Sequence, residues 1–113
     1  MLNEFRAVGN LGKAPTLETK LINGENRQVT NLYVFFDRRI RQEDDTYIDK
    51  GGFWMNVSFW DKRAEAAFRL LKKGTRVYIM GLLIKNQWLD SNQEEQSDLQ
   101  VNGEYFFIDP GCI

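Results

Sequence analysis

Hydrophobic and polar residues alternate strictly in the segment FWMNVSFW at positions 53–60. Alternation with a period of two is typical of a β-strand, because successive side chains point to opposite faces of the sheet. One face of this strand would be an ordinary core face, made of Phe53, Met55, Val57 and Phe59. The other face would carry Trp54 and Trp60 among polar residues, where neither a core nor a plain solvated surface explains a tryptophan.

Similar patterns predict strands on both sides of this segment. A charged, glycine-ended stretch at 37–52 precedes it and is expected to form a long hairpin loop. The Asn23–Gly24 pair predicts a tight turn, and Gly81 predicts a bend within a long strand. The remaining strands are expected at residues 5–12, continued by 16–21, and at 27–36, 75–89 and 101–108.

The segment 61–74 changes period and predicts the one helix of the chain. Its apolar residues recur at helical spacing, Asp61 is a candidate N-cap, and Gly74 lies just past the expected end. Five strands with a helix between the third and the fourth are the arrangement of the OB-fold, a small Greek-key barrel that binds oligonucleotides. The sequence therefore predicts a single all-β domain over residues 1–113, with one helix and a five-stranded OB-fold barrel.

Composition narrows the chemistry. The chain has no histidine and one cysteine. The usual zinc sites are therefore excluded for lack of His and Cys ligands, and Ser–His or Cys–His nucleophile pairs are excluded for lack of the histidine base. We therefore expect no enzymatic activity, no metal and no cofactor. No apolar run approaches the roughly 20 residues of a membrane span, and no secretory signal opens the chain. The lone Cys112 cannot form an internal disulfide, which favours the cytoplasm.

A net charge of −1 conceals a segregation of charge. Between Phe5 and Gln42 there are seven Lys or Arg residues and three acids. Between Trp60 and Trp88 there are seven Lys or Arg residues and two acids. The acids gather at 43–49 and 90–98, which we interpret as two acidic loop tips. A locally basic surface can bind phosphates even when the chain total is negative.

Four collinear segments resemble bacterial single-stranded DNA-binding proteins. They are VGNLGKAPTLE at 8–18, VTNLYV at 29–34, the long run 53–81 and WLD at 88–90. VGNLG alone is a weak signal, whereas the fixed order of all four is specific, and the resemblance covers the chain from about Phe5 to Ile108. It implies that bases stack on aromatic side chains while basic residues hold the phosphates. Such stacking is worth roughly 1–3 kcal/mol per base and tolerates any base sequence.

The resemblance also implies which residues bind. It assigns the aromatic positions to Trp54, Trp60 and Trp88, and basic positions to Lys62 and Lys73. The candidates added from local charge are Lys13, Arg38 and Arg39. Tyr33 and Phe36 could extend the aromatic platform, although strand residues of this kind are core residues at least as often.

Each candidate has an alternative interpretation that the sequence leaves open. The tryptophans could pack in a core or a protein interface. The arginines at 38–41 could be a solvated charge run balanced by the acids at 43–45. Lys72 and Lys73 fall in the last turn of the predicted helix, where cations stabilise the helix dipole whatever the function.

Several positions depart from the pattern of the family. Ile40 stands where an aromatic residue is expected, and the segment 82–88 carries only Lys85 where relatives are richer in arginine. Both changes predict weaker binding with a shallower salt dependence. Trp60 replaces a common phenylalanine and offers a larger stacking surface. Met55 replaces a histidine in a region linked with subunit contacts.

The last residues, FFIDPGCI, stand where family members continue through a disordered linker to an acidic tip that recruits other enzymes. We therefore expect a protein that covers single-stranded DNA without recruitment by that route, in replication, recombination, repair or DNA transfer, and that suits a mobile element. The resemblance implies a homotetramer, with a dimer as the second choice. Two alternatives stay open, a replication-restart protein of the primosomal type and an OB-fold protein-interaction module in which the tryptophans bind a partner.

Overall fold

Most of the chain forms one six-stranded sheet with a single helix packed against it. The computed structural model describes residues 3–112, with the backbone alone at positions 39, 40, 49 and 112. The strands are β1 (Glu4–Leu11), β2 (Thr16–Ile22), β3 (Glu25–Phe36), β4 (Arg39–Arg41), β5 (Tyr47–Asp49), β6 (Phe53–Trp60), β7 (Arg76–Leu89) and β8 (Glu95–Ile108). The helix α1 (Lys62–Leu70) lies between β6 and β7, and a 3₁₀ turn, η1 (Pro110–Cys112), follows β8.

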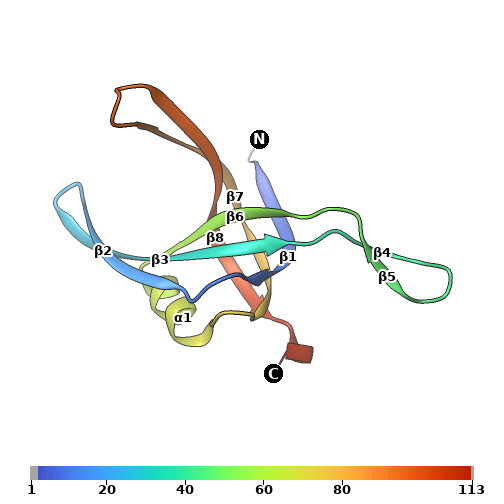
Figure 1. Cartoon of the computed structure of the whole chain (residues 1–113). Helices are drawn as coiled ribbons and strands as arrows, with labels where there is room; N and C mark the ends of the chain where they lie inside the picture. The colour runs from blue at the N-terminus through green and yellow to red at the C-terminus, as the bar shows by residue number, and fades with distance from the viewer. Residues whose placement is uncertain (1–2, 113) are drawn as a thin grey trace.

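The sheet closes on itself. Neighbouring strands follow the order β1–β7–β8–β6–β3, and β1 also pairs with β3, so these five strands form a ring (Figure 1). β2 pairs with the first part of β3 and β1 with its last residues, so β1 and β2 lie along one edge of β3. Along the chain, α1 lies between β6 and β7, which are the third and fourth strands of the ring. This is the predicted OB-fold arrangement.

Closure depends on a glycine where β1 meets β3. Gly9 pairs with Phe36, and a Cβ atom added at Gly9 would lie 2.3 Å from the carbonyl oxygen of Phe35. A second glycine, Gly81, sits at an irregularity in the β7–β8 pairing between Met80 and Gly81. The register passes from Met80–Tyr105 to Gly81–Gly103, so the extra residue is Glu104 of β8. The β-bulge, which lets a strand curve around a barrel, therefore lies on the partner strand opposite the predicted bend.

The two faces of β3 and β6 have different roles. On β3, Leu32, Val34 and Phe36 are buried in the barrel, together with Val57 and Phe59 of β6. Tyr33 and Trp54 lie on the outer face. The predicted alternation is confirmed for Val57 and Phe59, but Phe53, expected on the core face, is 47% exposed because it lies at the start of the strand. Phe36 is a core residue and cannot extend an aromatic platform. Because side chains alternate with a period of two, Phe35 shares the outer face with Tyr33 instead.

The helix is shorter than predicted. It ends at Leu70, and Leu71 is extended with φ −101° and ψ 148°, which places its side chain in the core at 3% exposure. Gly74, with φ +89°, belongs to the turn that follows, in which Thr75 donates to the carbonyl of Lys72. Lys72 and Lys73 therefore lie beyond the helix, so the dipole explanation for them is wrong.

The β4–β5 and β7–β8 hairpins extend from the barrel (Figure 1). The expected loop at 37–52 contains the short β4–β5 hairpin, which confirms that prediction. The expected acidic loop at 90–98 is a loop only from Asp90 to Glu94, because β8 begins at Glu95 rather than at residue 101. This part of the hairpin leaves the barrel and exposes both faces, so its sequence lacks the apolar alternation that marks a half-buried strand. Asn23 and Gly24 form the predicted tight turn, with φ of 50° and 82°.

Candidate nucleic-acid interface

An aromatic cluster occupies the outer face of β3 and β6. Trp54 is 49% exposed and lies parallel to Tyr33, with ring centroids 4.6 Å apart and an interplanar angle of 12°. Phe35, the cross-strand partner of Trp54, meets the indole at 5.1 Å and 56°. Neighbouring strands thus hold Trp54 against two rings while half of its surface remains open to solvent.

The loop after β1 completes this cluster. A Cβ atom at Gly12 would lie 2.3 Å from the indole of Trp54, so the ring packs directly on the glycine backbone. The next residue, Lys13, places its ammonium 5.4 Å from the centroid of Tyr33. The cation and the stacked rings therefore form one unit, in which a phosphate could contact Lys13 while a base stacks beside it.

Polar groups continue along the same face of β6. Ser58 is buried and donates its hydroxyl to Oδ1 of Asn31 at 2.9 Å, and Asn31 donates to Glu18 at 2.8 Å. Asn56 is exposed opposite Tyr33. These groups separate the cluster from Trp60 at the end of the strand. Six residues at about 3.3 Å each put Trp54 and Trp60 roughly 20 Å apart.

Trp60 lies in a second, more polar setting. The guanidinium of Arg27 covers its ring at 4.9 Å from the centroid. Arg27 also binds Asp61 through two hydrogen bonds, Nη2 to Oδ2 at 2.7 Å and Nε to Oδ1 at 3.2 Å. The hydrogen bonds of Arg27 lower the pKa of Asp61, so this carboxylate is ionised at neutral pH. Asp61 precedes α1, but its side chain makes no capping hydrogen bond, because it is turned toward Arg27.

A shallow hollow surrounds Trp60. Arg63 from α1 lies beside it, with its guanidinium 4.9 Å from the ring centroid of Tyr105. The lining residues are Arg27, Trp60, Asp61, Arg63, Asn102 and Gly103. This end of β6 therefore combines an aromatic ring with two guanidinium groups.

The remaining predicted cations are distributed around the barrel. Lys62 is the exposed first residue of α1, next to the Trp60 hollow in the chain. Lys73 is exposed in the turn before β7, and the neighbouring Gly74 donates to the carbonyl of Leu11. That hydrogen bond brings the turn beside the end of β1, close to the aromatic cluster.

Arg38 and Arg39 lie at the root of the β4–β5 hairpin. The carbonyl of Arg38 accepts a hydrogen bond from the amide of Lys50 at 2.8 Å, and Arg39 pairs with Asp49 in the ladder. Further out, Arg41 forms an ion pair with Asp45. Balancing by local acids is therefore the correct interpretation for Arg41.

Trp88 lies apart from the other tryptophans. It is 45% exposed on the β7–β8 hairpin, opposite Gln96, where the hairpin arches away from the barrel (Figure 1). Within the described part of the chain, no ring contact joins it to the aromatic cluster. The surrounding hollow is lined by Gln87, Trp88, Leu89 and Glu95.

A known protein family matches nearly the whole chain. The model of the single-strand binding protein family matches residues 2–107. The chain belongs to the single-strand binding protein family. A curated member, the single-stranded DNA-binding protein of Wolinella succinogenes, is 29% identical over 104 residues, which are 92% of this chain and 62% of the relative. The chain thus spans less than two thirds of that relative's length.

Solved structures of family members share the fold. The small single-stranded DNA-binding protein of Streptomyces coelicolor superposes with a TM-score of 0.76 at 14% identity, covering 98% of this chain and 97% of that one. A deletion mutant of the single-stranded DNA binding protein of Thermus aquaticus gives 0.71 at 22% identity, covering 97% and 51%. These likenesses confirm the predicted OB-fold of this single-strand binding family member.

Among residues 3–112, no three His, Cys, Asp or Glu side chains gather as a metal site would require. The described helices include none long and apolar enough to cross a membrane.

Proposed function

We propose that this chain binds single-stranded DNA with little preference for base sequence, as a binding protein rather than an enzyme. The observation that carries the proposal is the half-exposed Trp54 held in a stack with Tyr33, with the ammonium of Lys13 against the same ring. A stack that exists before the ligand arrives loses little conformational freedom when a base joins it. Membership of the single-strand binding family supports this use of the cluster.

The strand is proposed to follow the outer face of β6. One base stacks at Trp54, the polar groups of Asn31 and Asn56 line the middle, and a second base stacks at Trp60. Phosphates are held by the basic residues around this path, which are Lys13, Lys62, Lys73, Arg38 and Arg39. Trp88 contributes from the projecting hairpin, as a separate contact for a longer strand.

Assembly and biological setting belong to the same proposal. We propose a homotetramer, with a dimer as the second choice, acting in the cytoplasm where bacterial DNA is replicated, recombined and repaired. The family match favours strand binding over a restart protein of the primosomal type or a protein-interaction module.

The test is a titration with oligo(dT), followed by the quenching of tryptophan fluorescence at low and then at moderate salt. We expect quenching and an affinity that falls with salt, with a slope of about −0.7 per neutralised phosphate. Trp54→Ala should weaken binding roughly 5- to 150-fold, the equivalent of about 1–3 kcal/mol of stacking.

Heparin provides the matched control, because it carries negative charge but no bases. Trp54→Ala should leave the affinity for heparin unchanged. If oligo(dT) neither quenches nor binds at low salt, the proposed function is wrong, and Trp54 and Trp60 would belong to a protein interface.

A further inference from the structure

The hollow at Trp60 holds an arginine whose partner is a carboxylate of the same chain. Arg27 presents Nε and Nη2 side by side to the two oxygens of Asp61. This forked geometry is the one with which arginine also binds a phosphate. The side chains of Arg27 and Asp61 are 37% and 55% exposed, so an incoming phosphate can reach the pair from solvent.

Several features around the pair favour an anionic ligand. The Arg27 guanidinium lies over Trp60 and the Arg63 guanidinium over Tyr105, so two cations border one hollow. Asp61 is the one carboxylate among the six lining residues. A phosphodiester in this hollow would therefore meet two guanidinium groups and a single competing anion.

We propose that Asp61 competes with single-stranded DNA for Arg27, holding the guanidinium in the free protein and giving it up to a phosphodiester when a strand binds. This rests on the proposed function, and it names Arg27 and Arg63 as phosphate-binding residues. The exchange costs little, because a solvent-exposed ion pair contributes little to stability. The Arg27 guanidinium exchanges the Asp61 carboxylate for a phosphodiester and keeps its position beside Trp60. Asp61 thus limits the affinity of this subsite.

The decisive variant is Asp61→Asn in the full chain, assayed with oligo(dT) at low salt. Asn keeps the shape of the side chain and tolerates the positive φ of 58° at this position. The amide of Asp61 and its carbonyl, bonded to Gln28 and Ala64, are unaffected by the change. We expect binding about twofold to fivefold tighter than in the unsubstituted chain.

Glu65→Gln is the matched control, since Glu65 is the next acid along α1 and the change removes the same charge. It measures the general effect of one fewer negative charge near the site. The gain from Asp61→Asn should exceed that of Glu65→Gln, and the excess should vanish in an Arg27→Ala background. That background should itself bind more weakly than the unsubstituted chain.

The outcomes separate the two proposals. If the unsubstituted chain binds oligo(dT) but Asp61→Asn gains no more than Glu65→Gln, the competition is disproved and the proposed function stands. The competition is equally disproved if the excess survives without Arg27. If the unsubstituted chain does not bind at all, both proposals are overturned.

Discussion

Trp54 is half exposed, yet its indole is held in a fixed orientation between a glycine backbone and two aromatic rings. Gly12 gives the indole a flat backbone surface on which to pack, while Tyr33 and Phe35 restrict it from the sheet. An exposed aromatic side chain would otherwise sample several rotamers, at an entropic cost on binding. Gly12 therefore contributes to the binding surface because its lack of a side chain lets the indole of Trp54 pack on the backbone.

Gly12→Ala should weaken binding with little effect on the fold. The added methyl group would displace the indole, disrupting an aromatic pair worth about 0.5–1.5 kcal/mol, which corresponds to roughly twofold to tenfold weaker binding of oligo(dT). Urea unfolding followed by circular dichroism should show a loss of stability no larger than that pair energy.

Gly9→Ala makes the same substitution three residues earlier and serves as the comparison. Its methyl group would meet the backbone of Phe35, which cannot move aside as a ring can. Overpacking of this kind costs about 1–3 kcal/mol or more. Equal losses of stability in the two variants would contradict the distinct role assigned to Gly12.

From the residues alone, the face of the sheet on which a side chain lies could be predicted only where the local alternation of the strand determines it. The two-residue alternation put Trp54 and Trp60 on the outer face, and the structure agrees. The same rule, applied to β3, would have selected Phe35 instead of Phe36. Arg27 could not be found in this way, because its partners Trp60 and Asp61 are brought to it only by the pairing of β3 with β6.

The β7–β8 hairpin is an acidic arm rather than a basic one. Between residues 84 and 100, Lys85 is the only cation, against Asp90, Glu94, Glu95 and Asp98. Negative charge on the arm opposes a DNA backbone, so any contact at Trp88 must come mainly from stacking. The start of β8 was predicted too late in this arm. Polar residues on both strands gave no apolar alternation, although the β7–β8 pairing continues to Leu89 and Glu95.

Asp90 should make the tip of this arm sensitive to acid. Its carboxylate accepts hydrogen bonds from the amides of Glu94 and Asn92 and from the side chain of Gln96, which lower its pKa. A pKa lowered on folding means that the stabilisation is complete above the unfolded-state value of about 3.9 and is lost as pH falls through the lower folded value.

The pH dependence can be followed by NMR through the amide shifts of Asn92 and Glu94. We expect a transition with its midpoint below the ordinary aspartate value, absent in Asp90→Asn. A midpoint at or above about 3.9 would show that these hydrogen bonds do not favour the carboxylate.

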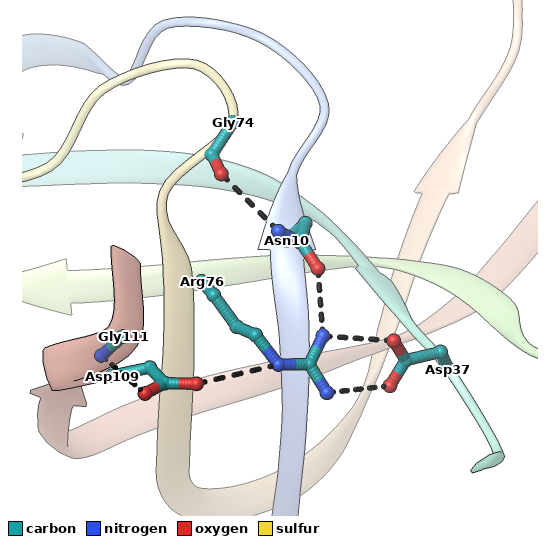
Figure 2. A network of polar contacts seen from close by, with 6 residues as sticks. All are labelled: Asn10, Asp37, Gly74, Arg76, Asp109 and Gly111. Atoms are coloured by element: carbon teal, nitrogen blue, oxygen red, sulfur yellow. Dashed lines mark hydrogen bonds and ion pairs between the residues drawn. The ribbon is translucent and has the colours of Figure 1, made fainter. Parts of the chain in front are cut away.

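A polar network at one end of the barrel joins parts of the chain that are far apart in sequence (Figure 2). Arg76, at the start of β7, donates to Asp37 at 2.8 and 3.2 Å and to Asn10 at 2.8 Å, and its Nε lies 3.7 Å from Asp109. Asn10 in turn donates to the carbonyl of Gly74. The network therefore ties β1, the root of the β4–β5 hairpin and the segment after β8 to one side chain.

Asp37→Asn should destabilise the protein substantially. The side chains of Arg76 and Asp37 are only 16% and 9% exposed, so removing the charge of Asp37 leaves a poorly solvated cation. The expected loss is about 2–4 kcal/mol, measured as a lower urea midpoint. Glu4→Gln breaks the Arg6–Glu4 pair, whose side chains are more than half exposed, and should cost less than about 1 kcal/mol. Similar losses in both variants would refute the importance of burial here.

The pairing of β1 with both β3 and β7 has a consequence for how the protein is made. During synthesis β1 leaves the ribosome before β7, so its pairing with β7 must wait until the chain beyond Arg76 exists. Contacts between such distant segments slow folding, and until they form, the edges of β1 and β7 are open to strands of other chains. Closure of the ring should therefore limit the folding rate, and crowding of nascent copies at that stage would favour misassembly.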